Sequence, residues 1–291
     1  MTLEDLERLA APLRSHVVSA IEFPEPAMRL DLASREGAPN RQFKYLHQMC
    51  LLHAENFAQA HQVKLVSLID GYQTIVRAGN ALGPYLFARS ILELSAFVYD
   101  VSRRLREIAV KPDPGWRSKG EEFFALVVRA RFATTDPKKR QALEAGGCPA
   151  KLLKPLNVMN SITALTGDPE AADVLANQYD KLCDFVHHNL SSQVTSSPGF
   201  RVGDTAHSAS GGALVLMKQA PITRYEYPVP NKAALALDET LPAVMKCIQI
   251  CVRRLNEMPR TPFSTDQVRV FTGSGLGLTT LVPGRVCPKA H

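Results

Sequence analysis

The fold of this chain is decided by residues 87–105, FARSILELSAFVYDVSRRL. Apolar residues recur there in alternating steps of four and three, the spacing of an a/d seam between packed helices. They are Phe87, Ile91, Leu94, Val98, Val101 and Leu105. Other apolar side chains cover most of the remaining surface, a pattern typical of a helix in the middle of a bundle. We therefore predict a central helix over about residues 85–109.

The few polar side chains of this predicted helix form a narrow stripe. Arg89, Glu93 and Asp100 fall within about 40° of one another at 100° per residue. A face in contact with solvent is normally broad, so the narrow stripe indicates charges that face a cleft or another polar element. The alternative is a surface ion pair between Arg89 and Glu93 at i, i+4, worth about a few tenths of a kcal/mol.

Helical periodicity predicts further helices on both sides of the central one. They cover residues 3–20, 40–78, 118–133, 150–165, 170–190 and 232–257, with another that begins at Asp136-Pro137. The 40–78 pattern fits either one long helix or two stacked ones.

The predicted fold class is mainly α: a multi-helix bundle with a small β-hairpin insertion and an irregular C-terminal tail. Residues 1–190 and 231–258 would form the bundle, residues 191–230 the hairpin or flap, and residues 259–291 the tail. The hairpin prediction rests on two β-like runs among Gly, Ser and Pro residues. These runs are Ala213–Lys218 and Thr223–Val229.

The composition, 45% hydrophobic and 21% charged over 291 residues, is ordinary for a folded protein. No run approaches the roughly 18 apolar residues of a membrane-spanning helix, and the N-terminus is acidic where a secretion signal would be basic. Scattered cysteines without a Cys-x-x-Cys motif favour reduced thiols. We therefore expect a cytoplasmic protein with no membrane contact, and we predict no cofactor and no metal site.

The positive charge of the chain is local. Residues 101–140 hold eleven Lys/Arg against five Asp/Glu, whereas the rest of the chain is balanced. Such a patch fits phosphate groups, and RNA or a nucleotide is the predicted partner. The alternative is a solvated basic face. The candidate phosphate contacts are Arg129, Arg131, Lys138, Lys139 and Arg140.

The end of the predicted 170–190 helix concentrates reactive side chains. Asp184 precedes His187 by three residues, so its carboxylate could orient and polarise the imidazole for general acid or base catalysis. The alternative is structural, because a histidine in a last helical turn is favoured by the helix dipole, with Asn189 as a left-handed terminator. Tyr179 lies on the same helix and is a further candidate for binding.

Two short motifs carry a resemblance to known proteins. Arg-x-x-x-Glu at 89–93 is followed some ninety residues later by Tyr-x-x-Leu-x-x-x-Val-His at 179–187. Over residues 40–190 the chain resembles uncharacterised bacterial helical proteins that are similar in layout to the HEPN superfamily. The resemblance implies a helical bundle, frequent dimers, and roles in RNA cleavage or phage defence. HEPN nucleases carry an arginine four to six residues before a histidine, and here the one such pair on a predicted helix is Arg41 and His47.

The sequence therefore leaves two functional hypotheses. In the first, a homo-oligomeric, HEPN-like bacterial protein acts on RNA or a nucleotide without a metal, with Arg89, Glu93, Asp184 and His187 as catalytic residues. Tyr179, Asp100, Asn189 and the basic patch would then bind the substrate. In the second, the protein is a non-enzymatic binding or regulatory module, and a buried Arg-Glu-Tyr-His network fixes the register of its helices.

Overall fold

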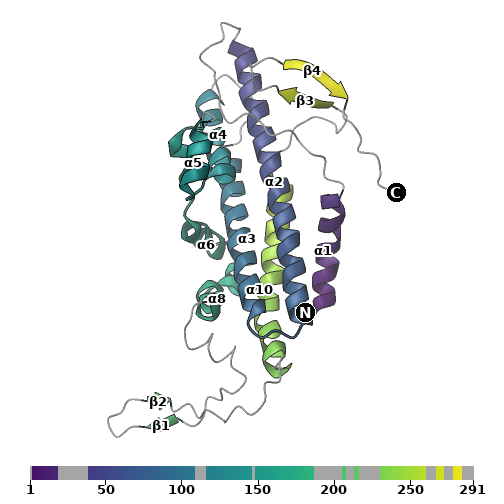
Figure 1. The fold of residues 1–291 in the computed structure, drawn as a ribbon, viewed down its shortest axis with the longest axis vertical. Helices are drawn as coiled ribbons and strands as arrows, with labels where there is room; N and C mark the ends of the chain where they lie inside the picture. Colours follow the sequence, from purple (N-terminus) through teal and green to yellow (C-terminus); the bar gives the residue numbers. More distant parts are fainter. Residues whose placement is uncertain are drawn as a thin grey trace. The chain divides into compact units, whose positions relative to one another are not determined.

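The computed structural model describes residues 2–18, 39–108, 116–145, 148–186, 205–207, 213–215, 230–259, 267–271 and 278–283. These residues are mainly helical (Figure 1), which confirms the predicted fold class at that level. Within them, no helix has the length and apolar character needed to span a bilayer.

The helices occur in the predicted order. They are α1 (Leu3–Val18), α2 (Pro39–Arg77), α3 (Gly83–Ile108), α4 (Trp116–Phe132), α5 (Pro137–Ala145), the 3-10 helix η1 (Ala150–Leu153), α6 (Val158–Thr166), α7 (Ala172–Leu175), α8 (Gln178–Val186) and α10 (Pro230–Asn256). For α2, α3 and α10 the predicted bounds are confirmed to within about two residues.

Local chemistry sets the start of the central helix α3. Gly79 adopts a left-handed φ of 68° just after α2, a conformation that glycine takes without strain. The Asn80 side-chain oxygen then accepts the backbone N–H groups of Leu82 at 2.9 Å and Gly83 at 2.7 Å. Because the first N–H groups of a helix have no partner within the helix, this contact stabilises the start of α3.

The prediction of one continuous helix is wrong in two places. The predicted 150–165 helix divides into η1 and α6, because Pro155 lies between them and cannot donate a helical hydrogen bond. The predicted 170–190 helix divides into α7 and α8 at Asn177, whose φ is 63°. Asparagine tolerates this left-handed conformation better than most residues, so a helical break occurs where the apolar periodicity alone predicts none.

The described residues include two pairs of short strands. Strand β1 (Thr205–His207) pairs with β2 (Ala213–Val215), and β3 (Gln267–Phe271) pairs with β4 (Leu278–Pro283), both antiparallel. Strand β2 lies in the first predicted β-like run, but the second run, 223–229, falls outside the described residues. The hairpin insertion over 191–230 therefore stays a prediction, and β3 and β4 lie where the sequence predicts an irregular tail.

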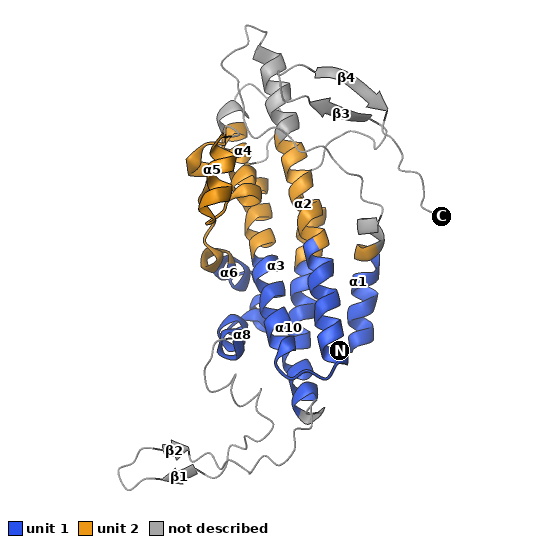
Figure 2. Ribbon diagram, in the orientation of Figure 1, with its two compact units in different colours: residues 1–12, 64–96, 162–250 blue, residues 13–63, 97–161, 251–291 orange. Residues whose placement is uncertain are grey.

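The chain forms two compact units (Figure 2), each made of several segments. Unit 1 comprises residues 1–12, 64–96 and 162–250, and unit 2 comprises residues 13–63, 97–161 and 251–291. Helices α2, α3 and α10 contribute residues to both units. The grouping of residues 1–190 with 231–258 as one bundle stays a prediction.

In unit 1, α2 and α3 both contribute to the core. Ile91 of the predicted seam and its neighbour Leu92 are fully buried, as are Leu65, Ile69 and Tyr72 of α2.

Helices α2 and α3 approach closely at Gly71. A Cβ atom on Gly71 would lie 2.6 Å from Cζ of Phe87, and closer still to Cε1, so the ring occupies the space of a side chain. This contact fixes the part of α3 that carries Arg89.

In unit 2, the core is formed by the other half of the α3 seam together with α2 and α4. Val101 and Leu105 of α3 are fully buried, as are Phe57 of α2 and Val127 of α4, and Phe123 is almost completely so. The seam predicted from sequence is therefore buried from Ile91 to Leu105, in both units, whereas Phe87 at its start is half-buried.

Candidate functional site

Arg89, Glu93 and Tyr179 form a polar cluster within unit 1. Nε of Arg89 on α3 donates a hydrogen bond to Oε1 of Glu93, one helical turn away, at 2.9 Å. Nη2 of Arg89 donates to the Tyr179 hydroxyl of α8 at 3.4 Å, and this hydroxyl donates to Glu93 Oε1 at 3.4 Å. The three side chains close a ring of interactions in which the two contacts to Tyr179 are long. The structure thus brings Tyr179 of the second motif into contact with Arg89 and Glu93 of the first.

The cluster is only partly buried. The side chains of Arg89 and Glu93 are 21% and 32% exposed, and the guanidinium carbon lies 5.4 Å from the centre of the Tyr179 ring. Burial by itself would lower the pKa of Arg89, but the hydrogen bond to Glu93 and nearby negative charge outweigh it, and the pKa is raised. Arg89 is therefore a fixed cation with access to solvent.

Cys183 belongs to the same cluster, although the sequence did not place it among the candidate site residues. Burial raises the pKa of the Tyr179 phenol, and a hydrogen bond with Cys183 adds to the increase, whereas Arg89 lowers it. The phenol stays protonated at neutral pH and can donate a hydrogen bond. Tyr179 and Cys183 are one helical turn apart on α8, a spacing that could have signalled their contact. We call Arg89, Glu93, Tyr179 and Cys183 the Arg89 cluster.

A stacked aromatic pair fixes α8 against α3 beside this cluster. The rings of Tyr85 and Phe185 lie 3.7 Å apart at an angle of 10°. The Tyr85 hydroxyl donates to Oε2 of Glu239 on α10 at 2.7 Å. Burial and the Glu239 carboxylate raise the pKa of Tyr85 far above its ordinary value, so this donor is retained at every physiological pH. Tyr85 precedes Arg89 by one helical turn, and its contacts position the Arg89 end of α3 within unit 1.

The predicted acid–base pair is described only in part. Asp184 lies on the exposed side of α8, the next residue after Cys183. His187 and Asn189 fall outside the described residues. The orientation of His187 by Asp184 stays a prediction.

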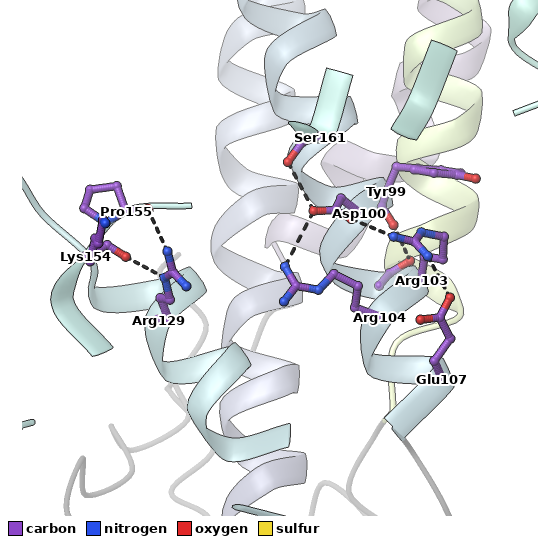
Figure 3. Close-up of polar contacts among 10 residues, drawn as sticks. Tyr99, Asp100, Arg103, Arg104, Glu107, Arg129, Lys154, Pro155 and Ser161 are labelled. Carbon is purple, nitrogen blue, oxygen red and sulfur yellow. Dashed lines mark hydrogen bonds and ion pairs between the residues drawn. The ribbon is translucent and has the colours of Figure 1, made fainter. Parts of the chain in front are cut away.

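Asp100 does not belong to the Arg89 cluster, although the sequence predicts one stripe for both. It lies in unit 2, where its Oδ2 accepts from the Ser161 hydroxyl at 3.3 Å and its Oδ1 from Arg103 Nη2 at 3.1 Å (Figure 3). Arg104 Nη1 lies 3.8 Å from Oδ2. This buried carboxylate is surrounded by donors from its own protein, and its local role is to hold α6 against α3 within unit 2.

The predicted phosphate contacts on α4 are occupied by internal partners. Arg129 donates from Nε to the carbonyl of Lys154 at 2.6 Å and from Nη2 to that of Pro155 at 3.0 Å (Figure 3). These bonds fix the turn between η1 and α6, where the carbonyls would otherwise have no helical partner.

Arg131 has an internal partner as well. Its Nη1 lies 2.8 Å from Nδ1 of His53, a fully buried residue on α2. A guanidinium only donates, so Nδ1 must accept, and the imidazole proton is on Nε2. Phe124 and Phe132 meet the imidazole edge-on, with ring centres at 5.2 and 6.0 Å. His53 is therefore a core residue that helps to fix α4.

The basic side chains of α5 have no such core role. Lys138, Lys139 and Arg140 are exposed, and no described residue of this helix is buried. Asp136 caps the helix by accepting the backbone N–H groups of Lys138 and Lys139 at 2.9 and 3.3 Å. Arg140 lies 3.4 Å from Glu144, a surface ion pair that contributes little to stability. Of the five predicted phosphate contacts, these three are the ones whose side chains are exposed.

Among the described side chains, no group of three His, Cys, Asp or Glu is placed to share a metal ion. Comparison with protein-family models, with curated proteins and with solved structures finds no match to this chain.

Proposed function

We propose that this protein acts on RNA or on a nucleotide without a metal, and that Arg89 binds the reacting phosphate. The observation that carries the proposal is the state of the Arg89 side chain. Two of its nitrogens are fixed by Glu93 and Tyr179, while Nη1 has no hydrogen-bond partner among the described residues and the side chain is partly exposed. A guanidinium fixed on one side and open on the other suits binding of a phosphate.

Each neighbour then has a defined role. Glu93 orients the guanidinium, since its Oε1 accepts from both Arg89 and Tyr179, and it is a positioning residue. The protonated Tyr179 phenol supplies a second neutral donor beside the guanidinium. As negative charge develops on the phosphate oxygens in the transition state, a preorganised cation lowers its energy without reorganisation.

The proton transfer is assigned to His187, oriented by Asp184. In cleavage of RNA, the imidazole would take the proton of the attacking 2′-hydroxyl as the new P–O bond forms and the P–O bond to the 5′-oxygen breaks, and the departing 5′-oxygen would take its proton from solvent. Neither proton transfer needs a metal ion. Exposed Lys138, Lys139 and Arg140 would contribute phosphate contacts along the chain of the substrate. The HEPN-like layout, a homo-oligomer and a role in phage defence belong to the same proposal.

A second candidate function is favoured by the packing around the cluster. The stacked Tyr85–Phe185 pair and the contacts of Arg89 with Tyr179 both hold α8 on α3, so the cluster could serve only to fix these helices in a binding or regulatory module.

One panel of variants separates the two functions. Purified full-length protein is incubated with mixed RNA, and Arg89→Lys, Tyr179→Phe and His187→Ala are compared with wild type for cleavage and for Tm. We expect cleavage by wild type and losses of about 10²-fold or more in Arg89→Lys and His187→Ala at a Tm within a few degrees of wild type. Intact RNA with wild-type protein, together with a markedly lower Tm in Arg89→Lys, would favour the structural role instead.

A further inference from the structure

The two compact units differ sharply in charge. Unit 2 contains 24 Lys/Arg against 14 Asp/Glu, whereas unit 1 contains 10 against 14. Unit 2 therefore carries a surplus of ten positive charges and unit 1 a surplus of four negative charges. Residues 101–140 supply six of the ten surplus positive charges of unit 2, and the remainder becomes visible only when its three separate segments are grouped together. This division of charge locates the attraction for a polyanion in unit 2.

Within unit 2, the C-terminal ends of α3 and α10 contribute arginines that the sequence did not place among the candidate contacts. Arg254 of α10 lies over the Tyr99 ring of α3 at 4.6 Å, and Arg106 Nη1 lies 3.0 Å from Glu257 Oε2. These contacts bring the two helix ends side by side in unit 2. We call the four arginines here that are not buried the α3–α10 arginine surface; Arg254 itself is buried. The four are Arg103, Arg104, Arg106 and Arg253.

The exposed members of this surface are weakly held. The Arg104 side chain is 39% exposed, and its one contact among the described residues is the 3.8 Å ion pair with Asp100. The Arg106 side chain is 44% exposed and pairs with Glu257. An exposed ion pair such as Arg106–Glu257 contributes about 0–1 kcal/mol, so a phosphate can replace it at little cost. The Arg104–Asp100 pair involves a buried carboxylate but is long, and Asp100 keeps Arg103 and Ser161 as donors if Arg104 turns to a phosphate.

The chemistry of the surface favours a nucleic-acid backbone over a protein partner. Protein interfaces bury an apolar centre, but the described residues 97–108 and 251–259 include no large exposed hydrophobic residue. A guanidinium group can bind a phosphate through two parallel N–H···O hydrogen bonds at once. Tyr99, the aromatic residue in contact with Arg254, is buried and offers no free face to a base. The contacts would therefore be to phosphates and independent of base sequence.

We propose that unit 2 binds the phosphate backbone of RNA through the α3–α10 arginine surface, with Arg104 and Arg106 as the main contacts. This inference rests on the proposed function for its choice of RNA, but it concerns a surface distinct from the Arg89 cluster. Binding at this surface holds the polymer through phosphates other than the reacting one that Arg89 is proposed to bind.

The test is a salt titration of binding. A fluorescent oligouridine of about 12 nucleotides is titrated with the full-length chain at several salt concentrations, and the slope of log K against log salt is measured. This slope is negative, and each lost phosphate contact reduces its magnitude by roughly 0.7 for single strands. Arg104→Gln/Arg106→Gln should therefore lower it by about 1.4, which reduces the loss of affinity between 50 and 200 mM salt about sevenfold relative to wild type.

Two further variants give this test matched controls. Arg8→Gln/Arg77→Gln removes the same charge from exposed positions of unit 1 and should leave the slope unchanged. Glu107→Gln removes a 61%-exposed carboxylate that pairs with Arg103 at 2.7 Å, and it should tighten binding. Misfolding could explain a loss of affinity but not this gain. Thermal melts followed by circular dichroism check that each variant is folded.

The outcomes separate this inference from the proposed function. Arg89→Gln should abolish cleavage and lower the magnitude of the slope by at most one contact, about 0.7, whereas Arg104→Gln/Arg106→Gln should lower it by about 1.4 whether or not wild type cleaves RNA. Equal losses in the unit 1 and unit 2 double variants would overturn the inference, as would an unchanged slope in Arg104→Gln/Arg106→Gln. Tighter binding of polyglutamate than of oligouridine would also overturn it, in favour of an acidic protein partner.

Discussion

Replacement of Gly71 by alanine tests the packing that positions the Arg89 end of α3. Alanine is favoured over glycine by about 1 kcal/mol in a helix interior. Its Cβ, however, would lie 2.6 Å from Phe87 Cζ and closer to Cε1, so the ring or the helix must move. Overpacking of this kind costs about 1–3 kcal/mol. We therefore expect Gly71→Ala to lower the free energy of unfolding by up to about 2 kcal/mol, measured by urea denaturation followed by circular dichroism.

Phe87→Leu provides the matched background, because leucine lacks the atoms that the new Cβ would meet. There Gly71→Ala should be neutral or stabilising by up to about 1 kcal/mol, since only the helix propensity remains. The two substitutions should thus couple by about 1–3 kcal/mol in a double-mutant cycle. An increase in stability for Gly71→Ala alone, with no coupling to Phe87→Leu, would refute the proposed close approach of α2 and α3.

Three other substitutions probe single contacts. Burial raises the pKa of Tyr72 to about 12, with the Thr240 hydrogen bond opposing it, so its contribution to stability is complete below pH 10 and lost as pH rises from 10 to 12. Tyr72→Phe should abolish that alkaline loss in urea titrations. Arg129→Lys keeps the charge but not the two carbonyl bonds and should destabilise unit 2 by about 1–3 kcal/mol in thermal melts; unchanged stability would return Arg129 to the list of phosphate contacts. Ser161→Ala removes a donor to the buried Asp100 and should cost about 1–2 kcal/mol in the same assay.

The helices could be predicted from sequence because their signals are local. The 4–3 steps from Phe87 to Leu105 and the punctuation at Gly79 and Pro84 are properties of the chain itself, and the bounds of α3 follow from them. The break at Asn177 was missed because apolar periodicity continues across it, from Leu175 to Leu182. The break depends on the backbone φ angle of a single residue, and the spacing of apolar side chains carries no information about that angle.

The candidate site was predicted in part, for a similar reason. Arg89 with Glu93 follows from helical spacing, but the contact with Tyr179 depends on how α8 packs on α3. Asp100 shares the stripe of Arg89 by angle, yet it lies three turns along α3 and in the other unit, where Ser161 meets it. Helical angle gives the face of a residue but not its neighbours. The internal use of Arg129 was likewise invisible, because its partners are backbone carbonyls 25 and 26 residues away.

The central claim is that Arg89 and His187 act on the same phosphate. The most direct measurement is the RNA-cleavage rate of the full-length chain in wild type, Arg89→Gln, His187→Ala and the double variant, at matched Tm. Residues that act as one unit are strongly non-additive. We expect each single variant to lose about 10²-fold or more, and the double variant to be no slower than the worse single one. Two results would contradict this claim: a loss in the double variant equal to the product of the two single losses, or wild-type protein that leaves RNA intact.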